Sequence, residues 1–160
     1  MNIRVGIGSD IHKLEANRKL IIGNLEITHN KGCVGHSDGD ALIHAICDAI
    51  LGAANMRDIG FHFPDYAAEN KDLDSSIFLK KVVKMLKTDG YEIGSIDTIV
   101  TLEKPKLSHY IPIIKSNLAK IIEIEESQIS IKAKTSEKLG FIGREEGIKA
   151  DAIVLIFKSK

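Results

Sequence analysis

Apolar and polar residues alternate in several short stretches of the chain and follow a helical period in three longer ones. Across residues 40–54 the apolar side chains recur every three or four positions, as in a helix with one buried face. Ser37 or Asp38 is the predicted N-cap of this helix. The same reasoning predicts further helices over 74–88, ending at Gly90, and 109–122, with strands over 3–12, 20–22, 25–27, 93–102, 129–133 and 152–157.

The order of these elements indicates one domain. A chain of 160 residues can bury a core without disulfides or structural metals. Strands interleaved with helices favour an α+β fold, with α/β as the alternative, and Gly23-Asn24 joins two short strands as a hairpin. We predict a single α+β domain spanning residues 1–160, in which a mixed β-sheet carries helices on one face.

Charge and composition exclude some partners. Lys plus Arg equals Asp plus Glu at 22 each, so no overall field attracts nucleic acid or an anionic membrane. No apolar run approaches the roughly 20 residues that span a bilayer, and the N-terminus lacks a targeting pattern. Cys33 and Cys47 are expected to be small buried apolar residues. We expect a cytoplasmic protein without nucleic-acid or membrane partners, or an organellar one if a leader has been removed.

The tripeptide Asp10-Ile11-His12 is the first candidate for chemistry. Residues two apart on a strand point to the same face, so Asp10 and His12 can converge on one point. Zinc binds carboxylate oxygen and imidazole nitrogen, and catalytic sites commonly supply three protein ligands. A surface aspartate beside a partly buried histidine is the alternative.

The helix that follows residues 36–40 supplies further candidates. His44 lies one turn after Asp40, and Asp48 one turn further, so the three are expected on one helix face. Asp40 or Asp48 could orient a ligating imidazole, and the helix start suits an anion near a metal. A solvated polar face is the alternative. Together with Asp10 and His12, His44 completes a predicted divalent-metal site, with zinc as the expected ion.

A loop after the strand at 129–133 is rich in hydroxyl, basic and glycine residues. Its backbone amides and charges suit phosphates, and Glu137 suits a hard cation. It lacks the spacing of a P-loop, so a hydrophilic turn is the alternative. Residues 58–60, 63–65 and 104–106 lie in further loops that are individually more typical of structure than of function.

In chain order, residues 8–12, 36–40 with His44, 58–60, 63–65, 105–106, 132–133, 135–141 and 143–148 carry a joint resemblance over essentially the whole chain. They resemble the 2-C-methyl-D-erythritol 2,4-cyclodiphosphate synthase family of the non-mevalonate isoprenoid pathway. The resemblance implies that Asp10, His12 and His44 bind zinc and that Glu137 holds Mg²⁺ or Mn²⁺ on the substrate diphosphate. His36 and Thr135 would be the catalytic residues, stabilising the transition state.

The resemblance also implies which residues bind the substrate. Asp10, His12, His36 and Ser37 would lie at the phosphates, with Ser136, Glu137, Phe141 and Arg144 as further contacts. The methylerythritol group would contact Asp58, Gly60, Phe63, Pro64 and Asp65. The cytidine pocket would comprise Leu102, Lys104, Pro105, Lys106, Leu107, Ser108, Ala133, Lys134 and Thr135.

The implied enzyme is a cyclising phosphorus-oxygen lyase. The 2-phosphate of 4-diphosphocytidyl-2-C-methyl-D-erythritol 2-phosphate would attack the diphosphate and release CMP, leaving the 2,4-cyclodiphosphate. In the family three subunits form a homotrimer with active sites between neighbours. Arg144 and Glu146 would line a central channel able to hold an isoprenoid diphosphate. The rival hypotheses are a metal-dependent phosphohydrolase and a non-catalytic isoprenoid-diphosphate-binding or zinc-storage protein.

Overall fold

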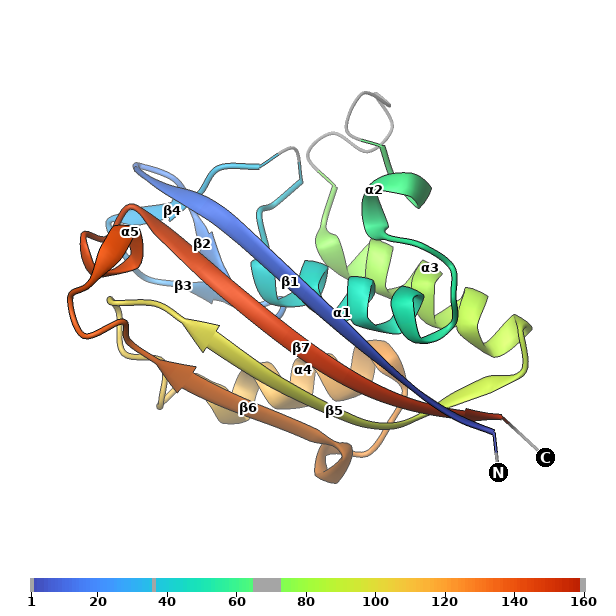
Figure 1. The fold of residues 1–160 in the computed structure, drawn as a ribbon. Helices are drawn as coiled ribbons and strands as arrows, with labels where there is room; N and C mark the ends of the chain where they lie inside the picture. The colour runs from blue at the N-terminus through green and yellow to red at the C-terminus, as the bar shows by residue number, and fades with distance from the viewer. Residues whose placement is uncertain (1, 36, 65–72, 159–160) are drawn as a thin grey trace.

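A computed structural model of the chain describes residues 2–35, 37–64 and 73–158. Its centre is a five-stranded sheet in the order β4-β1-β7-β5-β6 (Figure 1). β1 pairs antiparallel with β4 and β7, and β5 pairs antiparallel with β7 but parallel with β6. The predicted mixed sheet is therefore confirmed. The strands are β1 (Ile3–Ala16), β4 (Lys31–Cys33), β5 (Tyr91–Thr101), β6 (Ile129–Lys134) and β7 (Gly147–Lys158).

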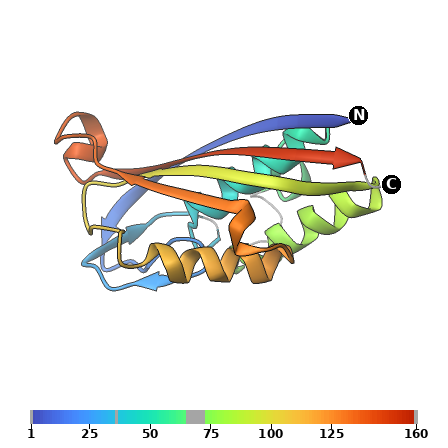
Figure 2. The ribbon, with the colours of Figure 1, turned by 90° about the horizontal axis from the view of Figure 1, so that it is seen from below.

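The long helices all lie on one face of this sheet (Figure 2). They are α1 (Ala41–Ala53), α3 (Ser75–Thr88) and α4 (Ile111–Ile122), and each matches a predicted helix. The predicted hairpin is also present, as β2 (Leu20–Ile21) and β3 (Glu26–Ile27). Shorter elements had too few residues to show a period: β4, α2 (Ile59–His62), α5 (Gly140–Gly143) and a 3₁₀ turn at Glu126–Gln128.

The start of α1 corrects one prediction. Asp40, rather than Ser37 or Asp38, is the N-cap, and its Oδ1 accepts the N–H of Ile43 at 3.1 Å. The completely buried carboxylate also accepts the N–H groups of Gly23 at 3.0 Å and Asn24 at 2.7 Å. The hairpin turn thus fixes where α1 begins, which the local sequence could not reveal. α3 begins after Asp74 and ends before Gly90, as predicted.

Two glycines of β1 bring α1 against the strand. A Cβ atom at Gly6 would lie 1.9 Å from the carbonyl oxygen of Ala49, and one at Gly8 would lie 2.0 Å from that of Ala45. Real side chains cannot approach a backbone oxygen so closely, so only glycine permits this packing. The contact sets the distance between β1 and α1, the two elements that carry the predicted metal ligands.

The other face of the sheet exposes apolar side chains. Ile7 of β1 is 73% exposed and Val5 is 62% exposed, with Ile3, Ile11 and Ile153 also on the surface. Exposed apolar patches of this kind commonly mark interaction surfaces. Within the described residues no helix has the length and hydrophobicity needed to cross a bilayer. Cys33 and Cys47 are buried free thiols, as expected.

Candidate metal centre and flanking pockets

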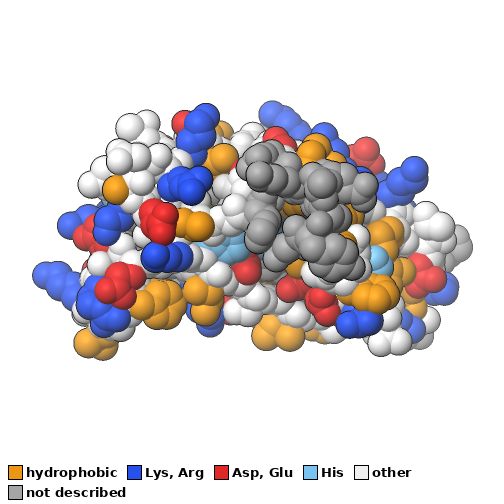
Figure 3. All heavy atoms as spheres, turned by 90° about the horizontal axis from the view of Figure 1, so that it is seen from above, with side chains coloured by type: hydrophobic (Ala, Val, Ile, Leu, Met, Phe, Trp, Pro, Cys, Tyr) orange, Lys and Arg blue, Asp and Glu red, His pale blue; other side chains and the backbone are white. Residues whose placement is uncertain are grey.

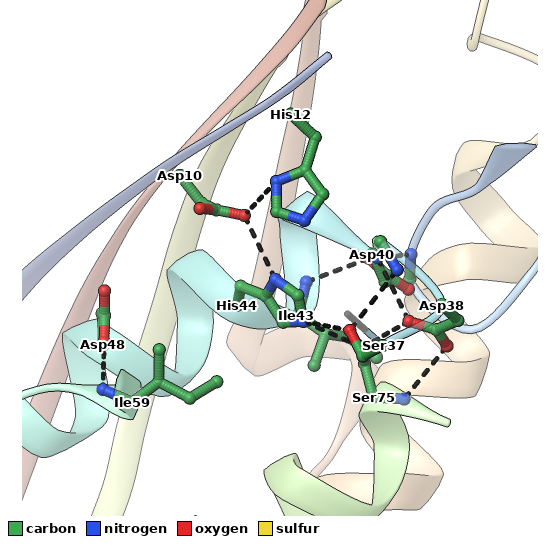
Figure 4. A network of polar contacts seen from close by, with 12 residues as sticks. Asp10, His12, Ser37, Asp38, Asp40, Ile43, His44, Asp48, Ile59 and Ser75 are labelled. Atoms are coloured by element: carbon green, nitrogen blue, oxygen red, sulfur yellow. Dashed lines mark hydrogen bonds and ion pairs between the residues drawn. The ribbon is translucent and has the colours of Figure 1, made fainter. Parts of the chain in front are cut away.

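Three predicted metal ligands meet between β1 and α1. Asp10 and His12 point from β1 toward α1, where His44 faces them (Figure 4). The Oδ2 atom of Asp10 lies 3.0 Å from Nδ1 of His12 and 3.2 Å from Nδ1 of His44. Each residue offers one ligand atom, and these atoms lie within 4.8 Å of one another. The predicted convergence of the three side chains is confirmed.

The electrostatics of this cluster favour a cation. Burial by itself raises the pKa of Asp10, but the interactions with His12 and His44 outweigh burial, so the pKa lies well below its ordinary value. Burial lowers the pKa of His12, but its hydrogen bond with Asp10 outweighs this effect and the net pKa is raised. Asp10 is therefore an ionised carboxylate that favours a positive charge next to it.

The donor atoms fit a divalent transition metal. One carboxylate oxygen and two imidazole nitrogens are donors that zinc accepts, and three such donors leave a fourth position for substrate. Ligands of a tetrahedral zinc with bonds of about 2.0–2.1 Å lie roughly 3.3 Å apart. The separations of 3.0 and 3.2 Å from Asp10 are close to that value. Asp10, His12 and His44 thus form a candidate centre for a divalent metal.

A cavity of about 330 Å³ opens beside the cluster. On the upper side of the molecule, histidine side chains reach the surface with Lys and Arg side chains near them (Figure 3). Two residues predicted to contact the methylerythritol group, Gly60 and Phe63, are among those that line the cavity together with the metal ligands and Ser37. Asp58 is the N-cap of α2, where its Oδ1 accepts the N–H of Phe61 at 2.9 Å, and its contact with the methylerythritol group stays a prediction. His36 and Asp65 lie outside the described residues.

The side of His44 away from Asp10 contacts two hydroxyl groups. Its Nε2 lies 3.0 Å from Oγ of Ser75 and 3.1 Å from Oγ of Ser37. The hydroxyl of Ser75 in turn donates to Oδ1 of Asp38. Sequence reasoning missed Ser75 and the role of Asp38. The only local signal was a pair of small hydroxyl residues, Ser75 and Ser76, at the start of a predicted helix.

Neither aspartate proposed to orient the imidazole does so. Asp40 binds the backbone of Gly23 and Asn24, and burial raises its pKa to about 6. Asp48 accepts the N–H of Ile59 at 2.7 Å, and burial raises its pKa as well. Both carboxylates accept hydrogen bonds from backbone N–H groups of a neighbouring segment, because those N–H groups have to be paired when they are buried. The alternative of a solvated polar helix face does not hold for Asp40 either, because Asp40 is completely buried.

A second cavity, of about 130 Å³, lies at the end of β6. Its lining was predicted in full as part of the cytidine pocket: Leu102, Pro105, Lys106, Leu107, Ser108, Ala133, Lys134 and Thr135. Lys104 points to another partner, Glu145, at 2.9 Å. The two cavities share no lining residue, and β7 and β5 separate β1 from β6, which is about 14 Å of sheet. One chain therefore presents the two predicted halves of the site apart.

The loop after β6 holds the predicted second cation ligand. The hydroxyl of Thr135 donates to Oε1 of Glu137 at 3.0 Å, and Glu137 adopts a positive φ of 53°. Beyond it, Arg144 forms a two-pronged ion pair with Glu146 at 3.0 and 2.9 Å. Among the described residues, Glu137 belongs to no cluster of three potential metal ligands. Its binding of Mg²⁺ or Mn²⁺ stays a prediction.

Comparisons with known proteins agree with the resemblance. The model of the YgbB family matches residues 3–157. A 2-C-methyl-D-erythritol 2,4-cyclodiphosphate synthase from Parabacteroides distasonis is 56% identical over 156 residues, which are 98% of this chain and 97% of that protein.

Solved structures show the same fold. The Plasmodium falciparum IspF, in complex with CDP, is 38% identical with a TM-score of 0.88, and the match covers 99% of this chain and 98% of that one. The bifunctional IspDF from Campylobacter jejuni is 39% identical with a TM-score of 0.93. That match covers 98% of this chain but 43% of the bifunctional one.

Proposed function

The chain belongs to the YgbB family and has the cyclodiphosphate synthase activity of its relatives, and we propose how its residues perform that activity. It converts 4-diphosphocytidyl-2-C-methyl-D-erythritol 2-phosphate to 2-C-methyl-D-erythritol 2,4-cyclodiphosphate with release of CMP. The main structural support is that Asp10, His12 and His44 converge beside a cavity that Gly60 and Phe63 also line.

The metal ligands and the phosphates form the first half of the proposed site. Asp10, His12 and His44 would hold zinc, which when bound supplies positive charge to anionic phosphate oxygens. The attacking group is already an anionic phosphate, so no strong general base is required and charge neutralisation with in-line alignment dominates. In this proposal His36 positions the phosphates and Ser37 lies beside them. Asp58, Gly60, Phe63, Pro64 and Asp65 hold the methylerythritol group.

The loop after β6 forms the second half. Lys106 and the neighbouring backbone would bind the cytidine, and the CDP complexes of the structural relatives support a cytidine-diphosphate ligand. Thr135 would contact the diphosphate while its hydroxyl orients Glu137, the proposed ligand of Mg²⁺ or Mn²⁺. Ser136, Phe141 and Arg144 complete the proposed substrate contacts. The negative diphosphate would draw the second cation to a carboxylate that is otherwise exposed.

Assembly as a homotrimer would join the two halves. The cavities lie apart in one chain, and the helix-free face of the sheet exposes Ile3, Val5, Ile7 and Ile11, which a neighbouring copy would cover. Arg144 and Glu146 would border a central channel that holds an isoprenoid diphosphate. A cytoplasmic location belongs to the same proposal and suits two buried free thiols.

The direct test is CMP release from the authentic substrate, with and without a chelator, in isotopically labelled water. We expect metal-dependent CMP release and a cyclic product free of solvent label. Label in the product phosphate would instead support a phosphohydrolase, and CMP release that survives complete chelation would contradict the metal centre.

A second experiment tests the shared site. His12→Ala and Thr135→Ala subunits, each inactive alone, are coexpressed with different tags and purified as mixed assemblies. If each site combines the β1 half of one copy with the β6 half of another, every mixed trimer contains one intact site out of three. Mixed assemblies without activity, or a monomeric wild type, would contradict this arrangement.

A further inference from the structure

We infer that Ser75 and Asp38 form a hydrogen-bonded relay that fixes the ring of His44 with Nδ1 toward the metal. The inference rests on the proposed metal centre and adds residues that act on it from outside the ligand set. Ser75 and Asp38 are therefore positioning residues. The relay runs from His44 through Ser75 to Asp38, on the side of the imidazole opposite Asp10 (Figure 4).

The carboxylate of Asp38 is the fixed end of the relay. Its Oδ2 accepts the backbone N–H of Ser75 at 3.0 Å, and its Oδ1 accepts the N–H of Asp40 at 3.2 Å. The N–H of Asp38 donates to the carbonyl of Leu73 at 3.2 Å. Both carboxylate oxygens thus act as acceptors. The contacts also tie the loop before α1 to the first residue of α3, so the carboxylate position follows from two elements of the fold.

The hydroxyl of Ser75 gives the relay its direction. Ser75 is completely buried, and a serine hydroxyl has one proton, which here goes to the acceptor-only carboxylate of Asp38. At its 3.0 Å contact with Nε2 of His44, Ser75 can therefore only accept a hydrogen bond. The proton of the neutral imidazole must then lie on Nε2.

This assignment has a consequence at the metal centre. With its proton on Nε2, His44 presents a lone pair on Nδ1 to Oδ2 of Asp10, 3.2 Å away. Two acceptors in contact repel unless a cation lies between them. The relay thus prepares the tautomer that a metal requires and makes the contact between His44 and Asp10 favourable when a cation is bound.

Ser37 offers a second hydroxyl but lacks the features that orient the first. Its Oγ lies 3.1 Å from Nε2 of His44, yet Ser37 is only half-buried and lines the cavity. Its hydroxyl is also 3.4 Å from that of Ser75. A hydroxyl that faces the cavity can rotate toward substrate, whereas that of Ser75 is held by Asp38. Ser75 is accordingly the partner that sets the tautomer.

Zinc affinity tests the relay without relying on turnover. The full-length wild type and the variants Ser75→Ala, Asp38→Asn, Ser37→Ala and Ser76→Ala are titrated with zinc against a chromophoric chelator. We expect Ser75→Ala to weaken binding about 10- to 100-fold, as for other outer partners of ligating histidines. Asp38→Asn should weaken it less, because the amide oxygen still accepts the hydroxyl proton. Ser76→Ala, the adjacent buried serine of the same helix, is the matched control and should bind like the wild type.

A spectroscopic readout covers the case in which Ser75→Ala does not fold. Long-range ¹H–¹⁵N correlation spectra of the zinc-loaded wild type should show His44 protonated at Nε2 and metal-bound at Nδ1. Metal bound at Nε2, or a proton on Nδ1, would overturn the relay whatever the variants do. Zinc affinity of folded Ser75→Ala within threefold of wild type, or a loss confined to Ser37→Ala, would overturn it as well. A wild type that binds zinc tightly but lacks cyclase activity would refute the proposed function while leaving the relay intact.

Discussion

Asp10 and Asp40 are two carboxylates near the same end of α1, and they differ in what surrounds them. Asp40 is completely buried, and its partners are backbone N–H groups of Gly23, Asn24 and Ile43. The side chain of Asp10 remains 24% exposed, and its partners are the imidazoles of His12 and His44. Backbone donors can only donate, whereas an imidazole nitrogen can exchange its proton for a metal.

The difference separates a structural carboxylate from a functional one more clearly than burial does. The pKa of Asp40 is raised because burial outweighs its three N–H donors, and the pKa of Asp10 is lowered because its imidazole partners outweigh burial. Asp40 pairs backbone N–H groups that would otherwise lack an acceptor. Asp10 collects positive charge at the edge of a cavity. Four predictions test this contrast.

Asp10→Ala should have the largest effect. Removing one of three metal ligands should abolish tight zinc binding and lower kcat/KM by at least about 10³-fold, or about 4 kcal/mol. The free energy of unfolding of the metal-free protein should fall by less than in Asp40→Ala, because among the described residues Asp10 accepts no backbone hydrogen bond. Zinc content, turnover and urea unfolding are measured on the same preparation. Normal zinc content would mean that Asp10 is not a ligand.

Asp40→Ala should show the opposite profile. Three N–H groups lose their acceptor and α1 loses its cap, so the free energy of unfolding should fall by about 3–4 kcal/mol. Asp40→Asn retains an acceptor oxygen and should cost about 1 kcal/mol. Urea denaturation measures both, and the fraction that stays folded should bind zinc within threefold of wild type. If the free energy of unfolding of Asp40→Ala fell by less than about 1 kcal/mol, Asp40 would not have the structural role assigned to it.

The pH dependence of stability should distinguish the two carboxylates further. The pKa of Asp40 is about 6 in the folded protein against an ordinary value of 3.8, so the folded state holds this proton more tightly. As pH rises from about 4 to 6, this group should lower the free energy of unfolding, by roughly 2–3 kcal/mol. Asp40→Asn lacks the titrating group, so urea midpoints measured from pH 4 to 7 should fall less steeply for the variant. Parallel curves would contradict the assignment.

Asp48 lies between the two cases and should give the smallest effect. Its carboxylate holds the N–H of Ile59 at the start of α2, beside Gly60 in the cavity wall. Asp48→Ala should raise KM for the substrate about three- to tenfold while zinc affinity stays unchanged, since the lost hydrogen bond is worth about 1 kcal/mol. Asp48→Asn, which keeps the acceptor, should restore KM. Weaker zinc binding in Asp48→Ala would instead link this residue to the metal.

Most of the fold and part of the site could be predicted from the local periodicity of the sequence. The two-residue spacing of Asp10 and His12 predicted a shared face because a strand has that period, and the helical period located His44. The hydrogen bond from Ile43 that caps α1 is local, but the two contacts that distinguish Asp40 from Ser37 and Asp38 come from the hairpin turn, 16 and 17 residues away. Ser75 was equally hidden: its contacts with His44 and Asp38 span 31 and 37 residues and exist only after α3 packs.

The separation of the two cavities was also beyond the local pattern. The resemblance implied sites between neighbouring subunits, but the motifs themselves do not show which of them lie apart in one chain; the strand order places β7 and β5 between β1 and β6. Sequence spacing contains no information on strand order in a sheet, which depends on how the helices cross over it. The same order leaves one sheet face without helices, so the apolar residues Val5 and Ile7 remain exposed on the isolated chain.

The contact of Gly6 and Gly8 with α1 has a consequence for how this protein can change over evolution. No side chain separates the strand from the helix there, so the gap between Asp10 and His44 is set by backbone touching backbone. A methyl group at either glycine would act as a wedge beneath the metal centre. Gly6 and Gly8 therefore act as a fixed spacer between the strand and the helix that carry the proposed metal ligands.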